Sequence, residues 1–463
     1  MCFNLKIEVF LKYSILIVIG LTFQTSSAQK IWKTLAPQYQ WNESYNASIA
    51  RFPFDDIDQH TPFQNWALGN KWEKPFPDQT SQRFYMPSLL PYLNYNRVQG
   101  LEASVVAYYK LNDQTSLKGL VNYGFTDGVF RPQFELRHRT NKQNTFNVQV
   151  GNDLIQFNRS PAIVARANTI NNLLYDQNFA HLYASDYIAV SHYYQSKKKT
   201  ALKVKNKLSY NRNWSVQNNS QRYLFGSDFK GSFQSNKISP LGIPLGAFTQ
   251  IEQLSHELIL QLAGNNNQKT YFNHFGFYLN ATIPIQDAKI HQTNDQGQGV
   301  INESFKSYLQ WSFQHKQLIE INPLGPFKSF VQWGGFVKNS SLPYTALKHF
   351  NGNETAVMRG SYLEVFALLP YYDLSTDGLY FQSHFEQNFK GNLIDQIPLL
   401  NTLKLHSIVS FKSLITKNRS PYHEIGIGFG NIGLKAAKIF RIDFFKSLFN
   451  GRVNSGIRVG LVY

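Results

Sequence analysis

Cysteine is almost absent from this sequence, because the single cysteine among its 463 residues is Cys2. An apolar run, Tyr13–Phe23, follows two lysines and precedes small residues that end at Ala28. This order is typical of a secretory signal peptide, and the run is too short to span a membrane. We therefore expect residues 1–28 to be cleaved off, which leaves a mature chain with no thiol and no disulfide. Because Cys2 lies ahead of the apolar run, a lipoprotein is not expected.

Charged residues and long apolar runs are also scarce. Charged residues make up 16% of the chain, against roughly 25% in an ordinary soluble domain. After the signal, no segment approaches the roughly 18 consecutive apolar residues of a transmembrane helix, and the mean hydropathy is negative, at −0.33. Aromatic residues are abundant instead, with 37 Phe and 26 Tyr. This combination excludes a multi-helix membrane protein and favours a wall with one apolar face and one wet face.

The stretch from Tyr422 to Tyr463 shows such a wall most clearly. In its last part Ile457, Val459, Leu461 and Tyr463 fall on one face, and Arg458 falls on the other. A period of two residues is the spacing of a strand whose two sides meet different solvents. An outer-membrane barrel closes on such a strand, with its terminal aromatic residue in the interfacial girdle. We therefore expect these four residues to form the C-terminal signal for barrel insertion.

The same alternation recurs in segments of about ten residues that are separated by turn residues. The lysines at 203, 205 and 207 share one face of a strand. We expect them to point into the lumen or to lie at an interface, because a lysine facing lipid near the midplane costs about 2–4 kcal/mol. One strand is expected after Leu182, and the other confident strands are predicted at Gly100–Lys110, Leu117–Phe125, Phe130–Arg137, Thr145–Gly151, Ala201–Tyr210, Ile251–Ala263, Thr270–Ile285, Glu303–His315, Phe327–Lys338, Leu379–Lys390, Leu403–Ile415, Tyr422–Ile432, Phe440–Leu448 and Gly456–Tyr463.

A further strand at Phe84–Asn94, which contains Pro87 and Pro91, brings the total to about 16, an even number as in single-chain barrels. Four long connections then leave one side of the barrel, and the first of them holds a possible helix at Ala162–Tyr175. They are Asp153–Leu182, Asn211–Gln250, Gln286–Asn302 and Asn339–Leu374. The predicted fold is all-β: a closed antiparallel transmembrane β-barrel over 84–463. It is preceded by an irregular segment, 29–83, that is periplasmic or folded into the barrel mouth.

Several ordered motifs carry a resemblance to a known family. They are YNRVQGL (Tyr95–Leu101), GNDLIQFN (Gly151–Asn158), NNLLYDQNFAHLYASDYIAVSHYY (Asn171–Tyr194), LPYYDLSTDGLYFQSHFEQNFKGNLIDQIPLLNTLKL (Leu369–Leu405), and EIGIGFGNI with FRIDF (Glu424–Phe444). From about Phe84 onward the chain resembles an outer-membrane barrel family of unknown function found in Bacteroidota-type bacteria. Longer members carry an N-terminal carboxypeptidase-regulatory-like domain, which this sequence lacks. The resemblance implies a barrel in a Gram-negative outer membrane.

The C-terminal third is also similar, more distantly, to outer-membrane protein insertase and translocation barrels. In those proteins a long loop bears an Arg-Gly pair, and the resemblance implies that its arginine folds into the lumen and meets acidic residues. Here Arg359 lies in the connection Asn339–Leu374, and Glu386 lies on the following strand. We predict that Arg359 and Glu386 pair and hold the loop as a plug; the alternative is two solvated charges that never meet. The strand Leu403–Ile415 has no acidic partner, and the client-binding periplasmic domains are missing.

Other motifs are better explained by structure than by chemistry. Gly426, Gly428 and Gly430 precede more strand pattern rather than a helix, so they do not form a phosphate loop. His384 and Glu386 share a strand face without an evident third ligand, so neither a metal nor a cofactor is expected. No H-E-x-x-H, G-x-S-x-G or P-loop spacing occurs, so no enzyme is predicted, although twelve histidines leave a barrel hydrolase open.

The role predicted from the sequence is envelope biogenesis or transport through a loop-plugged lumen. The alternatives are a passive channel or structural barrel, and a barrel hydrolase. The net charge of +17 is assigned to the lumen and to lipopolysaccharide phosphates rather than to nucleic acid. Outer-membrane lipid, lipopolysaccharide and, during biogenesis, the barrel assembly machinery are the expected partners.

Arg359→Ala should loosen the plug and raise permeability to bulky antibiotics. Growth inhibition by such antibiotics, in cells that produce equal amounts of both proteins, measures this effect. Unchanged permeability at normal expression would contradict the predicted pair.

Overall fold

The protein is described by a computed structural model. The described residues are 83–86, 93–158, 163–175, 177–196, 200–220, 246–248, 250–264, 271–285, 289–293, 299–304, 306–338, 342–358, 362–398, 401–417, 419–434 and 437–461. The predicted signal peptide, the segment 29–82, Arg359 and Tyr463 therefore lie outside the described residues.

One antiparallel sheet of 17 strands dominates the fold. Strands β1 and β2 both pair with β3, at opposite ends of one edge, so the sheet has sixteen positions. Each later strand pairs with the next one in the sheet. The strands are β1 Phe84–Tyr85, β2 Leu93–Asn96, β3 Gly100–Lys110, β4 Thr115–Gly124, β5 Phe130–Arg139, β6 Asn144–Gln156, β7 Leu182–Gln195, β8 Thr200–Ser215, β10 Gln250–Gly264, β11 Tyr271–Pro284, β14 Tyr308–Ile321, β15 Gly325–Lys338, β16 Tyr380–Asn388, β17 His406–Thr416, β18 Tyr422–Leu434, β19 Ala437–Phe449 and β20 Arg452–Leu461.

These strands confirm the all-β prediction and its count of about 16, with two local differences. The described parts of the predicted strand Phe84–Asn94 are β1 and the start of β2, whose registers against β3 differ by three residues, while residues 87–92 lie outside the described residues. The predicted strand at Glu303–His315 is divided between β13, Gly299–Ser304, and β14. Strand β13 forms a separate small sheet with β9, Gly246–Phe248, and β12, Lys289–Thr293.

The long connections leave one end of the sheet, as predicted, because they join β6 to β7, β8 to β10, β11 to β14 and β15 to β16. The first contains helix α4, Ala165–Leu174, inside the range where a helix was expected. The connection between β16 and β17 is also long and lies at the opposite end, with the short helix η4, Asn401–Leu403. Among the described residues, no helix combines the length and the hydropathy that a membrane crossing requires.

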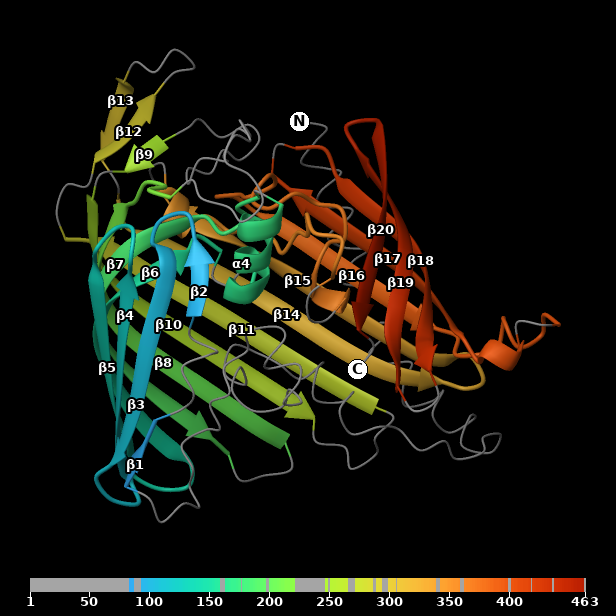
Figure 1. Ribbon diagram of the computed structural model, residues 1–463, viewed down its shortest axis with the longest axis horizontal. Helices are drawn as coiled ribbons and strands as arrows, with labels where there is room; N and C mark the ends of the chain where they lie inside the picture. Colours follow the sequence, from blue (N-terminus) through green and yellow to red (C-terminus); the bar gives the residue numbers. More distant parts are fainter. Residues whose placement is uncertain are drawn as a thin grey trace.

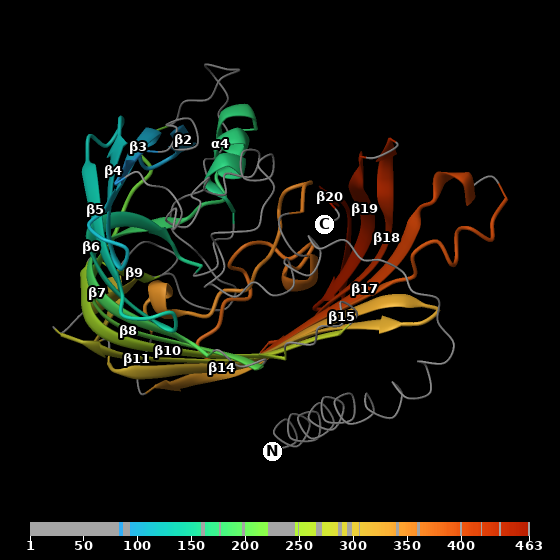
Figure 2. The same cartoon turned by 90° about the horizontal axis from the view of Figure 1, so that it is seen from below.

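The sheet is bent into an open trough (Figures 1 and 2). Figure 2 shows β2–β6 as one arm, β8, β10, β11 and β14 as the floor and β15–β20 as the other arm, with α4 and the orange connection between β15 and β16 in the hollow. Within the described residues, β20 has no ladder with β1, β2 or β3, so the predicted closure of the barrel is absent there. At that edge of β20, Val357 from the connection in the hollow forms a parallel bridge with Val459.

The convex outer face is apolar. Leu117, Leu136, Val148, Val190 and Leu208 lie opposite one another on five successive strands, and all five are exposed. Lysines 203, 205 and 207 alternate with this row and face inward, where Lys205 lies 2.9 Å from the carboxylate of Glu257. A continuous apolar outer wall over a polar inner wall is the pattern of a sheet that faces lipid.

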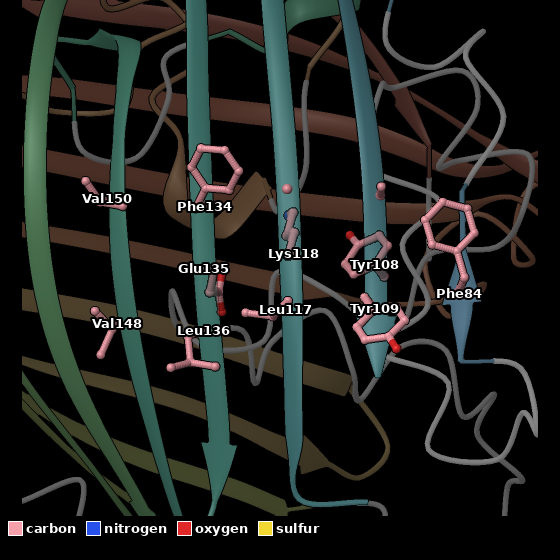
Figure 3. Close-up of a pocket in the computed structure, with 12 residues that line it drawn as sticks. Phe84, Tyr108, Tyr109, Leu117, Lys118, Phe134, Glu135, Leu136, Val148 and Val150 are labelled. Atoms are coloured by element: carbon pink, nitrogen blue, oxygen red, sulfur yellow. The ribbon is translucent and has the colours of Figure 1, made fainter. Parts of the chain in front are cut away.

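The outer wall also has an apolar groove of about 330 Å³ over β1 and β3–β6 (Figure 3). Ala107 and Gly119 lack large side chains, and Phe84, Tyr109 and Phe134 stand around the space that results.

Val148→Lys should lower the free energy of unfolding in lipid vesicles by about 2–4 kcal/mol, because it places a charge on the outer face in the middle of β6. Gln149→Lys is the matched control, since Gln149 faces inward and its amide donates to Glu135. Urea titrations followed by the folded and unfolded bands on a gel measure both variants. Equal losses in the two variants would contradict this assignment of the faces.

Candidate functional site: a loop held inside the sheet by buried charges

The connection between β15 and β16 folds back onto the concave face of the sheet. We call its described residues, 342–358 and 362–374, the inner loop; it contains the short helices η2, Tyr344–Ala346, and η3, Tyr362–Glu364. Its apolar side chains pack against side chains from β16–β19. The buried groups of this contact are Phe350, Phe366, Leu369 and Leu374 with Tyr380, Leu414 and Tyr422, and Met358, Ala367 and Leu368 with Phe445.

The inner loop also reaches the opposite arm of the trough. The Tyr371 ring lies 5.6 Å from the Phe179 ring, in the segment after α4. The Asn158 side-chain amide donates to the Asn351 side-chain oxygen at 3.0 Å. Tyr371 and Phe179 belong to a buried cluster that includes Val98 from the turn between β2 and β3. The loop therefore spans the hollow from one arm to the other.

One carboxylate on β18 binds the backbone of the inner loop directly. Glu424 is 1% exposed, and its two oxygens accept the backbone N–H groups of Ala367 and Leu368, each at 2.7 Å. The Tyr422 hydroxyl donates to the same carboxylate at 2.7 Å. Hydrogen bonds to a charged group are stronger than neutral ones, and the two bonds from Ala367 and Leu368 are shielded from water.

Three cationic side chains also bind the same loop segment. The Lys412 ammonium, on β17, donates to the Val365 carbonyl oxygen. The Arg458 guanidinium, on β20, donates through Nε to the Ala367 carbonyl oxygen at 2.7 Å. Lys316, on β14, pairs with the Glu364 carboxylate at 2.5 Å. Residues 364–368 are therefore held by side chains from four strands, and we call this set of contacts the loop clamp.

A second group of charges lies beside the loop clamp on the inner face. We call Lys328, Glu386, Arg441 and Asp443 the charge cluster. Glu386 lies 3.0 Å from the Lys328 ammonium and 2.6 Å from Arg441 Nη1, and Arg441 also binds the Asp443 carboxylate at 2.7 Å. A buried charge costs several kcal/mol unless it is paired, and each charge here has at least one opposite partner. The cluster fixes β15, β16 and β19 to one another across the inner face.

The glycine string of β18 makes room for these side chains. A Cβ atom on Gly428 would lie 1.9 Å from an Asp443 carboxylate oxygen, and one on Gly426 would lie 2.3 Å from the Phe445 ring. Asp443 and Phe445 therefore fold over β18 where it has no side chains. This confirms that the glycines belong to a strand, and it shows that close approach of a neighbouring strand requires them.

Of the predicted plug pair, Glu386 is among the described residues and Arg359 is not. Glu386 points inward, as predicted, and its carboxylate binds Lys328 and Arg441. Arg359 lies outside the described residues, so its pairing with Glu386 stays a prediction. Ile457 and Val459 face outward, as the alternation of the last strand predicts, while Leu461 ends β20 and Tyr463 is not described.

The sequence interpretation missed most residues of the clamp and the cluster. Arg441 and Asp443 were visible as charges two apart in an apolar strand, FRIDF, which puts both on the inner face. Glu424 and Lys412 have the same inward parity in β18 and β17. The sequence therefore indicated which charged side chains face inward. It did not indicate that the backbone of the inner loop would be their partner.

His384 and Glu386 share the inward face of β16 but do not act together. The His384 ring is fully buried and packs at 4.4 Å from the Phe366 ring, and neither of its nitrogens has a hydrogen-bond partner among the described residues. No group of three or more histidine, cysteine or acidic side chains suited to a metal occurs among the residues that the structure describes.

A serine–histidine contact and a carboxyl with a raised pKa, that of Glu354, lie in or next to the inner loop. His349 Nδ1 lies 2.7 Å from the Ser375 hydroxyl, and its Nε2 lies 3.0 Å from the Tyr344 carbonyl oxygen. Burial raises the pKa of the Glu354 carboxyl, although the Tyr371 N–H that it accepts at 2.8 Å acts in the opposite direction.

An antiparallel sheet of sixteen positions, apolar outside and charged inside, defines a protein of the β-barrel membrane class. Residues 65–429 match the C-terminal domain of a family of unknown function, DUF5686, and the chain belongs to that family. No curated protein matches it.

Solved structures that resemble the chain are outer-membrane proteins with low sequence identity. BamA from Haemophilus ducreyi, lacking POTRA domains 1-3, is 9% identical with a TM-score of 0.39, covering 79% of this chain and 69% of that one. Pseudomonas aeruginosa OprD is 12% identical with a TM-score of 0.27, covering 78% and 88%. Pseudomonas aeruginosa OccK11 (OpdR) is 9% identical with a TM-score of 0.28, covering 82% and 94%.

Gly428→Ala should destabilise the protein by about 3 kcal/mol or more, because the new methyl group would displace Asp443 from Arg441 and break a buried pair. Gly119→Ala is the control: its Cβ would lie 3.8 Å from the Phe134 ring, and alanine in a strand should gain about 0.5 kcal/mol. Unfolding in lipid vesicles measures both. An equal effect of the two substitutions would show that Gly428 does not make room for Asp443.

Proposed function

We propose that this protein is an outer-membrane β-barrel whose lumen is closed by its own inner loop, and that it serves envelope biogenesis or regulated transport. The observation that carries the proposal is the bond between Glu424 and the backbone of Ala367 and Leu368. A charged side chain that binds loop backbone, rather than lumenal water, holds the loop as a plug. The plug can open only if the loop clamp is broken or exchanged.

Three further features support an outer-membrane location with lipid and lipopolysaccharide as partners. The outer wall is apolar over successive strands, and its groove of about 330 Å³ has the shape and apolar lining that suit an acyl chain. The net charge of +17 suits contact with anionic lipid phosphates. The barrel assembly machinery would act during insertion of such a protein.

A passive channel is the alternative, and it requires an unobstructed lumen. The inner loop argues against it, because buried side chains from both arms of the trough hold the loop in the hollow. A hydrolase is the third candidate. Its support is the contact between His349 and Ser375, and Ser375 is 1% exposed, which does not suit a nucleophile that must meet substrate. We therefore propose no enzymatic activity.

Planar-bilayer conductance tests the plug. The wild-type protein should show little steady conductance, and Glu424→Gln should increase the time spent open by roughly tenfold or more, because two charge-assisted hydrogen bonds each contribute about 1.5–3 kcal/mol. Glu257→Gln is the matched control, since Glu257 faces inward and pairs with Lys205 on the floor of the trough. A large steady conductance of the wild-type protein would establish the channel instead.

A further inference from the structure

The apolar groove of Figure 3 results from the register of β3, β4 and β5 on the outer wall. Ala107 on β3 lies opposite Gly119 on β4, and Gly119 lies opposite Phe134 on β5. Because Ala107 and Gly119 have little or no side chain, a space of about 330 Å³ is left between their larger neighbours. Figure 3 shows Phe84 on one side of this space and Val150 on the other. The groove therefore belongs to the sheet itself and not to a loop.

The outer wall becomes polar beside one end of this groove. We call the end of the sheet where β3 joins β4, and β5 joins β6, the lower end. The last apolar row of the groove toward the lower end consists of Tyr109, Leu117, Leu136 and Val148, which lie opposite one another. Two residues further along each strand, or about 7 Å, is a row that we call the histidine row. It consists of Thr115, His138, Phe146 and His192.

Two imidazole rings stand in the histidine row, and each has one nitrogen bonded to a neighbouring strand. His138 Nδ1 lies 2.9 Å from the Thr115 hydroxyl, and His192 Nε2 lies 2.9 Å from the Asn144 side-chain oxygen. The His192 ring also stacks on the Phe146 ring, with 4.7 Å between centroids and 25° between planes. Both rings are therefore fixed in place. The second nitrogen of each has no partner among the residues that the structure describes.

The histidine row and the turn beside it suit an anionic group. Lys142 lies in the turn between β5 and β6, two residues before Asn144, and is exposed. Asp113, in the turn between β3 and β4, is the nearby acid, and the Lys110 ammonium pairs with it at 2.8 Å. A phosphate at this row can accept hydrogen bonds from imidazole N–H groups and from an ammonium, and bonds of this charge-assisted kind are strong.

The apolar lining alone would select no particular lipid. An acyl chain gains little by moving from other acyl chains to an apolar wall, because both surroundings are equally apolar. Filling the groove restores dispersion contacts that an unfilled space would lose, and the polar part of the lipid then decides which molecule stays. A phospholipid has its phosphate at the membrane boundary and its chains toward the midplane. The histidine row and the groove follow one another along the strands in the same order.

We propose that the groove and the histidine row form one binding site for a phospholipid, with an acyl chain in the groove and the phosphate at His138 and His192. The inference deepens the proposed function, because it rests on the outer-membrane location. The long connections of such a barrel leave on the outside of the cell, so the lower end lies in the inner leaflet. The lipid at this site is therefore a phospholipid and not lipopolysaccharide.

The first test fills the groove. The folded full chain is placed in vesicles of phosphatidylethanolamine and phosphatidylglycerol that contain a small fraction of phosphatidylglycerol with a photoreactive diazirine in one acyl chain. Labelled peptides, mapped by mass spectrometry, should concentrate on β3, β4 and β5. Ala107→Leu should reduce this labelling several-fold. Ala281→Leu is the matched control, because Ala281 alternates with the exposed Ile283 and so faces outward on β11.

The second test removes the phosphate contacts and leaves the groove intact. The double variant His138→Ala/His192→Ala should reduce labelling in the groove about fivefold or more, since a lost hydrogen bond is worth about 1 kcal/mol. His315→Ala is the matched control: His315 on β14 also accepts or donates at an asparagine, Asn273, and stacks on Phe275 at 4.5 Å. A diacylglycerol with the same photoreactive chain but no phosphate should label the groove no more than the rest of the wall.

Even labelling around the outer wall would mean annular lipid only and would overturn the proposal. Unchanged labelling in Ala107→Leu or in the double histidine variant would also overturn it, and so would equal labelling by the diacylglycerol. Displacement of the labelled phospholipid by lipopolysaccharide at lower concentration than by phosphatidylglycerol would show that the assigned lipid is wrong. A chain that does not fold into vesicles would refute the proposed location together with this site, whereas a folded chain with even labelling would refute the site alone.

Discussion

The structure depends on one constraint: the backbone of the inner loop must find partners inside a sheet whose outer face is apolar. Glu424 meets this constraint by accepting two adjacent N–H groups, and Lys412 and Arg458 meet it from the other side by donating to carbonyl oxygens. A buried carboxylate and buried cations would each be costly alone. The loop backbone gives each of these charged groups a hydrogen-bond partner, so the charges that line the hollow also determine what fills it.

The need to fit and pair side chains on the inner face also explains the composition of β18 and β19. Glycine replaces side chains at 426 and 428 so that Phe445 and Asp443 can cross the inner face, and Asp443 then orients Arg441 toward Glu386. The apolar contact of the inner loop and the charge cluster therefore meet on one strand pair. A functional movement of the loop would have to leave the cluster intact while it breaks the clamp, and the two sets of contacts share no residue.

The prediction from sequence succeeded where the physics is local. A period of two residues assigns each side chain to a face whatever the neighbouring strand is, so the inward lysines of β8 and the outward Ile457 and Val459 could be assigned in advance. The helix expected within Ala162–Tyr175 is present as α4. The boundaries near Glu303 failed because a hairpin that leaves the sheet, β12–β13, has the same alternation as a strand within it. Glu386 was identified as inward and charged, but its partners Lys328 and Arg441 come from other strands.

By itself the sequence determined the class of fold, the side of the wall on which each strand residue lies, and the end of the sheet from which the long connections leave. It could do so because alternation, turn residues and strand number are properties of short segments and of their order. Only the tertiary structure decided that Glu424 binds loop backbone, that Arg441 joins Glu386 across the inner face, and that Val357 forms a bridge with Val459 of β20. Those contacts join residues far apart in the chain, and which of them meet depends on how a curved sheet folds around its own loop.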